Sequence, residues 1–180
     1  MSHNIQTVVF SGGCFWCTEA VFQKLRGVVN VSPGYTGGSV DNPTYEQVSS
    51  GTTGHAEAIK FEFDPMLISY RELLEVFFAT HDPTTLNRQG NDVGPQYRST
   101  IFYTDEEQKN SAEKIIQELN LANAYPNPIV TTIEPLIKFW DAEDYHKNYF
   151  ERNQNAPYCQ VVINPKIKKF KEKFASLIQN

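Results

Sequence analysis

Thr7-Val8-Val9-Phe10-Ser11-Gly12-Gly13-Cys14-Phe15-Trp16-Cys17 is the stretch from which the rest of the fold can be worked out. Its first four residues have the composition of a strand, and the next three form a turn that lets backbone come close to another group. Beyond it, Cys17, Val21 and Leu25 recur at four-residue spacing, which is typical of an amphipathic helix. Cys14 is therefore expected at or just before a helix N-terminus, where unpaired amides and the macrodipole favour thiolate over thiol. A thiolate beside Phe15 and Trp16 is a nucleophile next to an aromatic wall that accepts an apolar group.

The composition is that of an ordinary globular domain and argues against a nucleic-acid partner. Of the 180 residues, 40% are hydrophobic and 21% charged, so one domain with a sizeable core is expected. Lys and Arg number 16 against 21 Asp and Glu, which gives a net charge of −5. The basic run from Lys166 to Lys173 alternates with Ile167 and Phe170, which indicates the solvated face of a helix.

Neither an export signal nor a membrane span is visible in the sequence. Residues 1–4 lack a basic region, and no long apolar segment follows them. No apolar run approaches the roughly 20 residues needed to cross a bilayer. Three cysteines, an odd number, do not suggest a disulfide framework, so we expect reduced thiols and a cytoplasmic protein. Redox catalysis, metal binding and simple burial remain open for these thiols.

The order of the expected elements indicates an α+β fold. Strands are predicted at 5–10, 28–35, 55–64 and 97–103, helices at 14–26 and 69–80, and a short helical turn at 45–50. Their β-α-β-β-α-β order is that of the split βαβ, or ferredoxin-like, fold. We therefore expect a ferredoxin-like core with additional C-terminal helices and strands.

Two capping boxes and a proline locate further helices. Ser69 with Glu72 opens one helix, and Thr104 with Glu107 opens another that runs to about residue 121. Pro165 suits the first turn of a final helix, and further strands are predicted at 129–133 and 160–163. The loop at 80–96 has no regular pattern, and a loop of this length inside a compact domain is usually functional. The final helix would bury four apolar side chains, those of Ile167, Phe170, Phe174 and Leu177.

One carboxyl group is expected on the apolar face of a strand. Alternation over 55–64 puts Glu57 and His55 on the same face as Ile59, Phe61 and Phe63. If this face packs on the core, loss of hydration raises the pKa of Glu57 and makes it a general acid near neutral pH. The pattern equally allows a carboxylate paired with a Lys or Arg side chain. His55 is interpreted as a structural residue.

The tyrosine and cysteine candidates carry weaker signals. The chain has nine tyrosines, so Tyr45 and Tyr97 are expected to serve packing unless both converge on Cys14 and the acid. Cys17 begins the apolar helix stripe, which favours burial. Cys159 follows an Asn- and Gln-rich stretch, and a mobile thiol there could reach another sulfur.

The spacing of the thiols favours redox chemistry over metal binding. A C-x-x-C pair after a strand is a moderately specific redox signal. A zinc site needs a fourth ligand beyond the three thiols, and no second ligand pair supports one, so we expect no metal.

Several separate segments together resemble one known family. They cover roughly residues 5 to 165 and look like the peptide methionine sulfoxide reductases of the A type. The resemblance implies thiol-dependent reduction of the S epimer of methionine sulfoxide, free or in proteins, and hence repair of oxidised proteins. The segments are Gly13-Cys14-Phe15-Trp16, Gly34-Tyr35-Thr36-Gly37-Gly38, Pro43-Thr44-Tyr45, Gly54-His55-Ala56-Glu57, and the loop at 81–94 followed by Gln96-Tyr97-Arg98-Ser99.

The resemblance also assigns roles. The family's nucleophile falls on Cys14 and its acid on Glu57. The side chains that hold the sulfoxide oxygen are those of Tyr45 and Tyr97. Phe15 and Trp16 receive the substrate methyl group, and Asp92 supplies a carboxylate on the substrate side.

The expected cycle needs a second thiol and an external reductant but no bound cofactor. Attack leaves Cys14 as a sulfenic acid, and a second thiol converts it into a disulfide that thioredoxin, or another dithiol such as DTT, reduces. Many members of the family have glycine where this chain has Cys17, and some have two C-terminal cysteines where it has only Cys159. We expect Cys159 as the main resolving thiol, with Cys17 as its rival. A monomer acting as a single catalytic domain, residues 1–180, is expected.

Two other functions fit parts of the pattern. A thioredoxin-like disulfide oxidoreductase also has strand, C-x-x-C and helix, but Phe15 and Trp16 are bulky for that chemistry, and the order of elements differs. A binding module for methionine side chains would need the aromatic wall, but it would require neither a thiol nor a core-facing carboxyl group. Reduction of insulin without sulfoxide, and saturable binding without consumption of reductant, would identify these alternatives.

Overall fold

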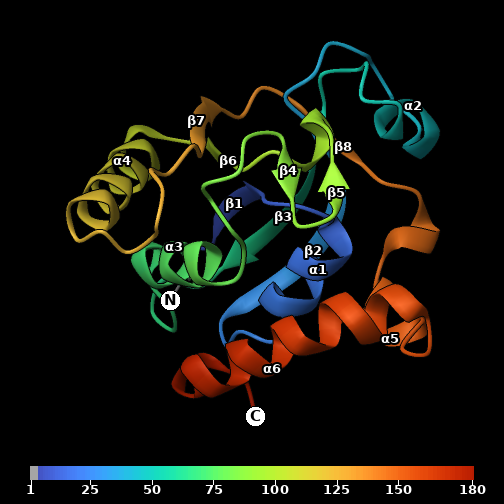
Figure 1. The fold of residues 1–180 in the computed structure, drawn as a ribbon. Coiled ribbons are helices and arrows are strands. Elements are labelled where there is room, and N and C mark those ends of the chain that lie inside the picture. Colours follow the sequence, from blue (N-terminus) through green and yellow to red (C-terminus); the bar gives the residue numbers. More distant parts are fainter. Residues whose placement is uncertain (1–3) are drawn as a thin grey trace.

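A six-stranded mixed sheet organises the molecule, and its strands follow the order β7-β6-β1-β3-β2-β8 (Figure 1). The computed structural model describes residues 4–180, so residues 1–3 of the predicted domain lie outside the described part. Neighbouring strands are antiparallel except β6 and β7, which are parallel. The strands are β1 (Gln6–Ser11), β2 (Val28–Thr36), β3 (Ala56–Phe63), β6 (Thr100–Tyr103), β7 (Thr132–Pro135) and β8 (Phe139–Asp141).

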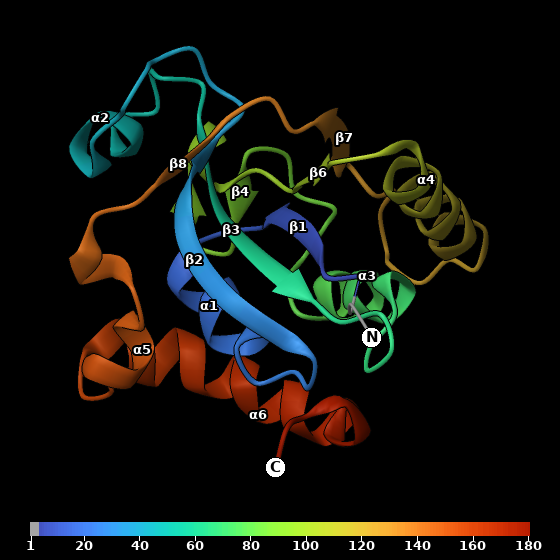
Figure 2. The same ribbon diagram turned by 180° about the vertical axis from the view of Figure 1, so that it is seen from behind.

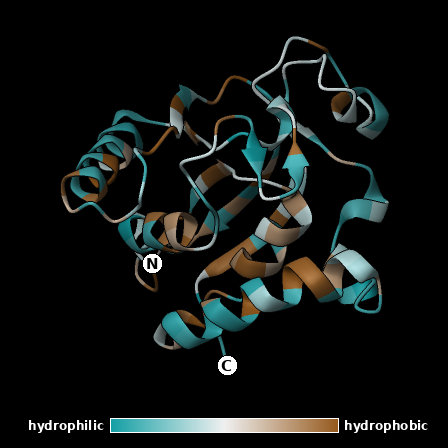
Figure 3. Cartoon of the chain, in the orientation of Figure 1, coloured by the Kyte–Doolittle hydropathy of each residue, from teal (hydrophilic) through white to brown (hydrophobic). Residues whose placement is uncertain are grey.

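Helices α1 (Phe15–Phe22) and α3 (Tyr70–Ala79) pack on the same face of this sheet. The ring of Phe10 in β1 stacks on Phe77 of α3 at 4.8 Å and meets Phe22 of α1 edge-on at 5.6 Å. Seen from behind, the long strands β2 and β3 lie in front of α1 (Figure 2). Hydrophobic residues gather on the strands and on α1, whereas α6 (Asn164–Lys173) alternates in character (Figure 3). The main core therefore lies between the sheet and α1 with α3.

The opposite face of the sheet holds a smaller apolar cluster. Val9, Ala56, Ala58 and Phe102 are buried there, and Leu136 and Phe139 pack against them. Strand β8 was not expected from the sequence. It pairs with β2, and the chain that follows it runs back toward α1 (Figure 1).

Alternation predicted β3 well, whereas the strand expected at 97–103 begins only at Thr100. Residues Pro95–Tyr97 form a 3-10 turn instead, and a short hairpin of β4 (Arg88–Gln89) and β5 (Asp92–Val93) lies within the loop at 80–96. Helix α1 ends earlier than expected because the C-terminal backbone pairs with the residues that follow it. Leu25 forms a β-bridge with Ile178, and Arg26 N donates to Leu177 O at 2.8 Å.

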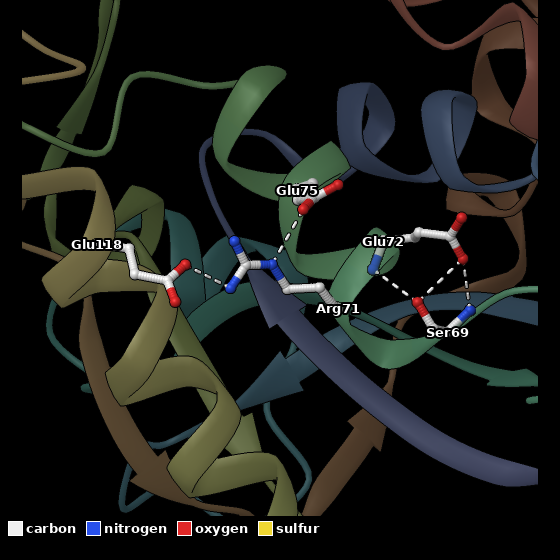
Figure 4. Close-up of polar contacts among 5 residues, drawn as sticks. All are labelled: Ser69, Arg71, Glu72, Glu75 and Glu118. Carbon is white, nitrogen blue, oxygen red and sulfur yellow. Dashed lines mark hydrogen bonds and ion pairs between the residues drawn. The ribbon is translucent and has the colours of Figure 1, made fainter. Parts of the chain in front are cut away.

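The predicted capping box of α3 is present and is shown in Figure 4. Ser69 Oγ accepts from Glu72 N, and Glu72 Oε2 accepts from Ser69 N at 2.8 Å. Two residues beyond Ser69, Arg71 pairs with Glu75 of the same helix at 3.0 Å. It also pairs with Glu118 of α4 (Glu106–Leu121) at 2.7 Å, which joins α3 to α4.

The second predicted capping box, Thr104 with Glu107, is wrong by one residue. Asp105 is the N-cap of α4, and its side chain accepts from Gln108 N at 2.8 Å. Gln108 is fixed by two further bonds, because its Oε1 accepts from Thr104 N at 3.0 Å and its Nε2 donates to Thr7 O at 2.9 Å. The bond to β1 thus selects Gln108, rather than Glu107, for the third position of the helix.

The prediction of a strand at 160–163 is wrong. Cys159–Ile163 is a π-helical turn that runs directly into α6. Cys159, Ile163 and Ile167 are all buried at four-residue spacing, so the helical period of α6 extends back to the thiol. Pro165 has no N–H to donate to the preceding turn, and a π-bulge is one way a helix accommodates a lost bond.

The strand expected at 129–133 begins later, at Thr132, and pairs in parallel with β6. The remaining helices are short: α2 (Tyr45–Ser49) matches the predicted helical turn, and α5 (Tyr149–Arg152) follows β8. In the described part of the chain, no helix combines the length and apolarity that a bilayer crossing requires.

Candidate active site

The turn between β1 and α1 puts Cys14 at the N-cap of the helix. Gly13 has a φ of +82°, which a side chain disfavours, and its N–H donates to Tyr97 O at 3.2 Å. A Cβ added at Gly13 would lie 2.6 Å from Cγ of Gln89 in β4. The turn is therefore closed by the loop that carries Tyr97, and no side chain fits between them.

Glu57 is a buried carboxyl group on β3, opposite Tyr35 of β2 in the sheet register. Its Oε1 accepts a hydrogen bond from Phe15 N at 3.1 Å, which brings the carboxyl group to the first turn of α1. Among residues 4–180, no ion pair includes Glu57. Of the two readings that the sequence left open, the desolvated carboxyl is the one that the structure has. Burial raises the pKa of Glu57 to about 8, so it holds a proton at neutral pH.

The two thiols of the C-x-x-C pair share a hydrogen bond, and both are buried. The expectation of a thiolate on Cys14 at rest is not met, because burial and the neighbouring Cys17 and Glu57 raise its pKa. The hydrogen bond from Cys14, helped by the charge of Lys166, instead lowers the pKa of Cys17 to about 7. One negative charge can thus rest on the pair, on the sulfur of Cys17.

Cys159 is fully buried in the π-helical turn. Burial, together with the nearby Cys17, raises the pKa of its thiol. All three cysteines are free thiols in the structure.

Both tyrosine candidates lie close to the acid and the nucleophile. Burial raises the pKa of Tyr45 and of Tyr97, and the charges of Glu57 and Cys14 raise both further. Each phenol therefore keeps its proton and remains a hydrogen-bond donor. Both phenols thus lie within electrostatic reach of Glu57 and Cys14.

The aromatic wall is larger than the predicted pair, Phe15 and Trp16. The ring of Trp16 stacks on Tyr149 of α5 at 3.7 Å, with an angle of 6° between the planes, and its Nε1 donates to His146 Nδ1 at 3.0 Å. His146 is fully buried and lies 5.0 Å from the ring of Phe15 and 4.5 Å from that of Tyr45. The segment after β8 thus completes the wall.

Glu143, in the same segment, ties two tyrosines together. Its Oε1 accepts from Tyr35 Oη, and its Oε2 accepts from Tyr45 N, each at 3.0 Å. These bonds fix the start of α2 against β2 and so orient the side chain of Tyr45.

Asp92 lies in β5 at the edge of a cleft of about 380 Å³. Its Oδ2 accepts from Tyr158 Oη at 2.8 Å, and the same hydroxyl lies 3.6 Å from Cys17 Sγ. The cleft is also lined by Cys14, Cys17 and Lys166. A larger cavity of about 660 Å³, between the end of α3 and α6, contains none of the three cysteines. The smaller cleft therefore gives access to Cys14, but its lining does not include Glu57, the two tyrosine candidates, Phe15 or Trp16.

Five residues around the site were missed from the sequence. They are Glu143, His146 and Tyr149 after β8, Tyr158 near the C-terminal helix, and Tyr35 in β2. The concentration of aromatic and acidic residues over 139–149 is the one signal that could have pointed to the first three. Among residues 4–180, no group of His, Cys, Asp or Glu side chains is arranged to hold a metal ion.

Comparisons with known proteins agree with this geometry. A family model described as peptide methionine sulfoxide reductase matches residues 6–178. The peptide methionine sulfoxide reductase MsrA of Saccharolobus solfataricus is 51% identical over 175 residues, which cover 97% of this chain and 98% of that protein.

Solved structures share the fold. Mxr1 from Saccharomyces cerevisiae in its reduced form has a TM-score of 0.78 at 34% identity, over 86% of this chain and 89% of that chain. The same yeast protein in complex with Trx2 has a TM-score of 0.56 at 25% identity, over 83% and 89% of the two chains. With its mixed α/β fold and its match over nearly the whole length, the chain belongs to the peptide methionine sulfoxide reductase family and is an oxidoreductase.

Proposed function

We propose that this protein reduces the S epimer of methionine sulfoxide, free and in proteins, with Cys14 as nucleophile and Glu57 as acid. The observation that carries the proposal is a neutral, buried carboxyl group bonded to the first turn of the helix that Cys14 caps. A sulfoxide is a poor electrophile until its oxygen is protonated or strongly hydrogen-bonded, and a neutral carboxylic acid supplies that proton.

In the first step, the Cys14 sulfur attacks the sulfoxide sulfur while Glu57 gives its proton to the oxygen. Cys17, whose lower pKa leaves it as the thiolate of the pair, accepts the proton of Cys14 along their hydrogen bond as the Cys14 sulfur attacks. Tyr45 and Tyr97 donate to the same oxygen, and such donors each contribute roughly 10²–10³ in rate. The protonated oxygen then passes from the substrate sulfur to the Cys14 sulfur while the new sulfur–sulfur bond breaks, so methionine leaves and Cys14 remains as a sulfenic acid.

Phe15 and Trp16 receive the methyl group of the substrate. Burying one methyl group contributes about 0.8 kcal/mol, so the aromatic wall orients the sulfoxide more than it holds it. Asp92 is proposed on the substrate side of the cleft, where its bond to Tyr158 has to yield to a ligand that needs the carboxylate.

Cys17 is proposed as the first resolving thiol. The sequence favours Cys159, but the hydrogen bond between Cys14 and Cys17 and the burial of Cys159 support the other order. The Cys17 sulfur attacks the sulfenic sulfur, a disulfide forms, and the oxygen leaves as water. Cys159 then takes over the bond to Cys17 by exchange once its helical turn opens, which returns Cys14 to its thiol form.

Thioredoxin is the proposed electron donor, and no bound cofactor takes part. The solved complex of the similar yeast protein with Trx2 supports this choice. Any small dithiol such as DTT carries out the same exchange. The net charge of −5 and the three free thiols support a monomer that works in the cytoplasm without a nucleic-acid or membrane partner.

We further assign the inner part of the fold to the split β-α-β-β-α-β arrangement within one catalytic domain, residues 1–180. The strand order β6-β1-β3-β2, with antiparallel neighbours and with α1 and α3 on one face, supports this assignment.

The function is tested by an NADPH- and thioredoxin-coupled assay with the separated S and R epimers. Oxidation of NADPH with the S epimer alone is expected. Turnover of the R epimer at an equal rate would contradict the assignment. Reduction of insulin without sulfoxide would favour a general disulfide reductase, and saturable binding without NADPH consumption would favour a binding module.

A further inference from the structure

One stripe of α1 receives the segment that completes the aromatic wall. Trp16, Glu19 and Gln23 follow one another at helical spacing, so they share a face of the helix. Trp16 binds His146, as described above, and Gln23 Nε2 donates to Asn148 Oδ1 at 2.6 Å. Between these two contacts, the carboxyl group of Glu19 accepts from the backbone N–H groups of residues 148 and 149.

Glu19 supplies the cap that α5 lacks. Asn148, the N-cap residue of α5, has a left-handed φ of 54°, and its own side chain makes no capping bond. The first amides of this four-residue helix would otherwise point into the protein without acceptors. The carboxyl group of Glu19 takes two of them, and the ring of Tyr149 is thereby held on Trp16.

The environment of Glu19 is unusual for a purely structural acceptor. The residue is only 1% exposed, and its second oxygen, Oε2, is buried without a hydrogen-bond partner. A glutamine would offer the same acceptor without any charge to bury. The charged groups that face Glu19 are Arg152 of α5 and Lys147 of the preceding turn. Lys24, two residues beyond α1, pairs with Glu151 of α5 at 3.5 Å.

We propose that Glu19 is a positioning residue for sulfoxide reduction, which holds residues 146–149 on α1 and so shapes the pocket for the substrate methyl group. His146 and Tyr149 reach Phe15, Trp16 and Tyr45 only while this segment is docked. The effect on sulfoxide reduction rests on the proposed function, whereas the docking of residues 146–149 on α1 does not.

The docking depends on pH with a defined sign. Burial raises the pKa of Glu19 to about 7 from an ordinary value of 4.5, although the two backbone amides, Arg152 and Lys147 lower it. A group whose pKa is raised in the docked state favours docking most when it is protonated. The segment is therefore held most firmly at low pH, and the contact weakens as the pH rises through about 7.

Trp16 fluorescence tests the docking without any substrate. The chain has two tryptophans, so Trp140→Phe leaves Trp16 as the sole reporter, and Cys17→Ser in the same background removes the neighbouring thiol that titrates at a similar pH. The emission of Trp16 is expected to change with a midpoint near pH 7, and the Glu19→Gln variant, which is neutral at every pH, is expected to show no such change. The proposal would be overturned if Trp16 emission did not change with pH in the protein that keeps Glu19. It would also be overturned if Glu19→Gln showed the same transition. If Glu19→Gln fails to fold, the response of the parent protein alone decides.

Enzyme kinetics test the consequence for the reaction. KM for methionine sulfoxide is expected to rise about tenfold between about pH 6 and 8.5, and Glu19→Gln is expected to remove this rise. Glu72→Gln is the matched control, because Glu72 also accepts at the start of a helix but belongs to α3. A glutamine keeps that acceptor, as Gln47 does in α2, so the pH course of KM should stay intact. An unchanged pH course in Glu19→Gln counts against the proposal. Absence of any reduction would refute the proposed function while the fluorescence result still stands.

Discussion

At the scale of single residues, two glutamate side chains of the site differ in pKa because their surroundings differ. Burial keeps Glu57 protonated near neutral pH, although its carboxyl group accepts a hydrogen bond from Phe15 N. In Glu143, burial acts in the same direction, but the bonds from Tyr45 N and Tyr35 Oη outweigh it and lower the pKa. Glu57 can therefore give a proton, whereas Glu143 is a fixed acceptor that orients its neighbours.

The cysteines are predicted to differ in one turnover without reductant. Cys14→Ser should release no methionine, because the nucleophile is missing. Cys17→Ser should release about one equivalent and then stop at the sulfenic acid, which mass spectrometry detects as one added oxygen. Cys159→Ser, the control for loss of a thiol, should form the Cys14–Cys17 disulfide. A Cys14–Cys159 bond in the wild type would contradict the proposed order.

Glu57 is also predicted to make stability depend on pH. Its pKa of about 8 lies above the ordinary 4.5, so its contribution is complete below pH 4.5 and is lost as the pH rises through about 8. The loss amounts to at most about 1.4 kcal/mol per pH unit within that window. In urea unfolding, the free energy of unfolding of Glu57→Gln should therefore increase relative to that of the wild type as the pH rises. Glu62→Gln, on the other face of β3, is the control and should not show this change with pH. Equal changes in both variants would refute the assignment of the pH dependence to Glu57.

At the scale of elements, local rules predicted what is decided locally. Alternation fixed the buried face of β3, and the pair of Ser69 with Glu72 fixed the start of α3. The errors lie where a distant partner decides: Thr7 O selects Gln108 at the start of α4, and Ile178 ends α1 by pairing with Leu25. A strand was predicted at 160–163, directly after Cys159, because four residues are too few to separate the two periods.

The turn between β1 and α1 is predicted to tolerate no side chain. Gly13→Ala combines a φ of +82° with a Cβ 2.6 Å from Gln89, so it should move Cys14 and lower kcat at least tenfold. Gly90→Ala is the matched control, with a φ of +57° and nothing within 4 Å, so it carries the backbone strain alone. Its kcat should stay within about twofold of the wild type. Equal losses in both variants would show that strain, not the contact, matters.

At the scale of the whole molecule, the site is assembled from five separate parts of the sequence. They are the helix start at 14–17, the start of α2 with Tyr45, strand β3, the loop with Asp92 and Tyr97, and the segment 143–158. Sequence motifs named most residues of the first four parts. They could not supply the fifth, because its aromatic side chains gain their role only through contacts with α1.

The pH dependence of single-turnover reduction tests the central claim most directly. With saturating S sulfoxide and no reductant, the rate of methionine release should fall as the pH rises through about 8, where Glu57 loses its proton. Glu57→Gln should be slower by roughly 10²–10³ and should not show that alkaline fall. A wild-type rate that stays level well above pH 8, or an alkaline fall that survives in Glu57→Gln, would contradict the account.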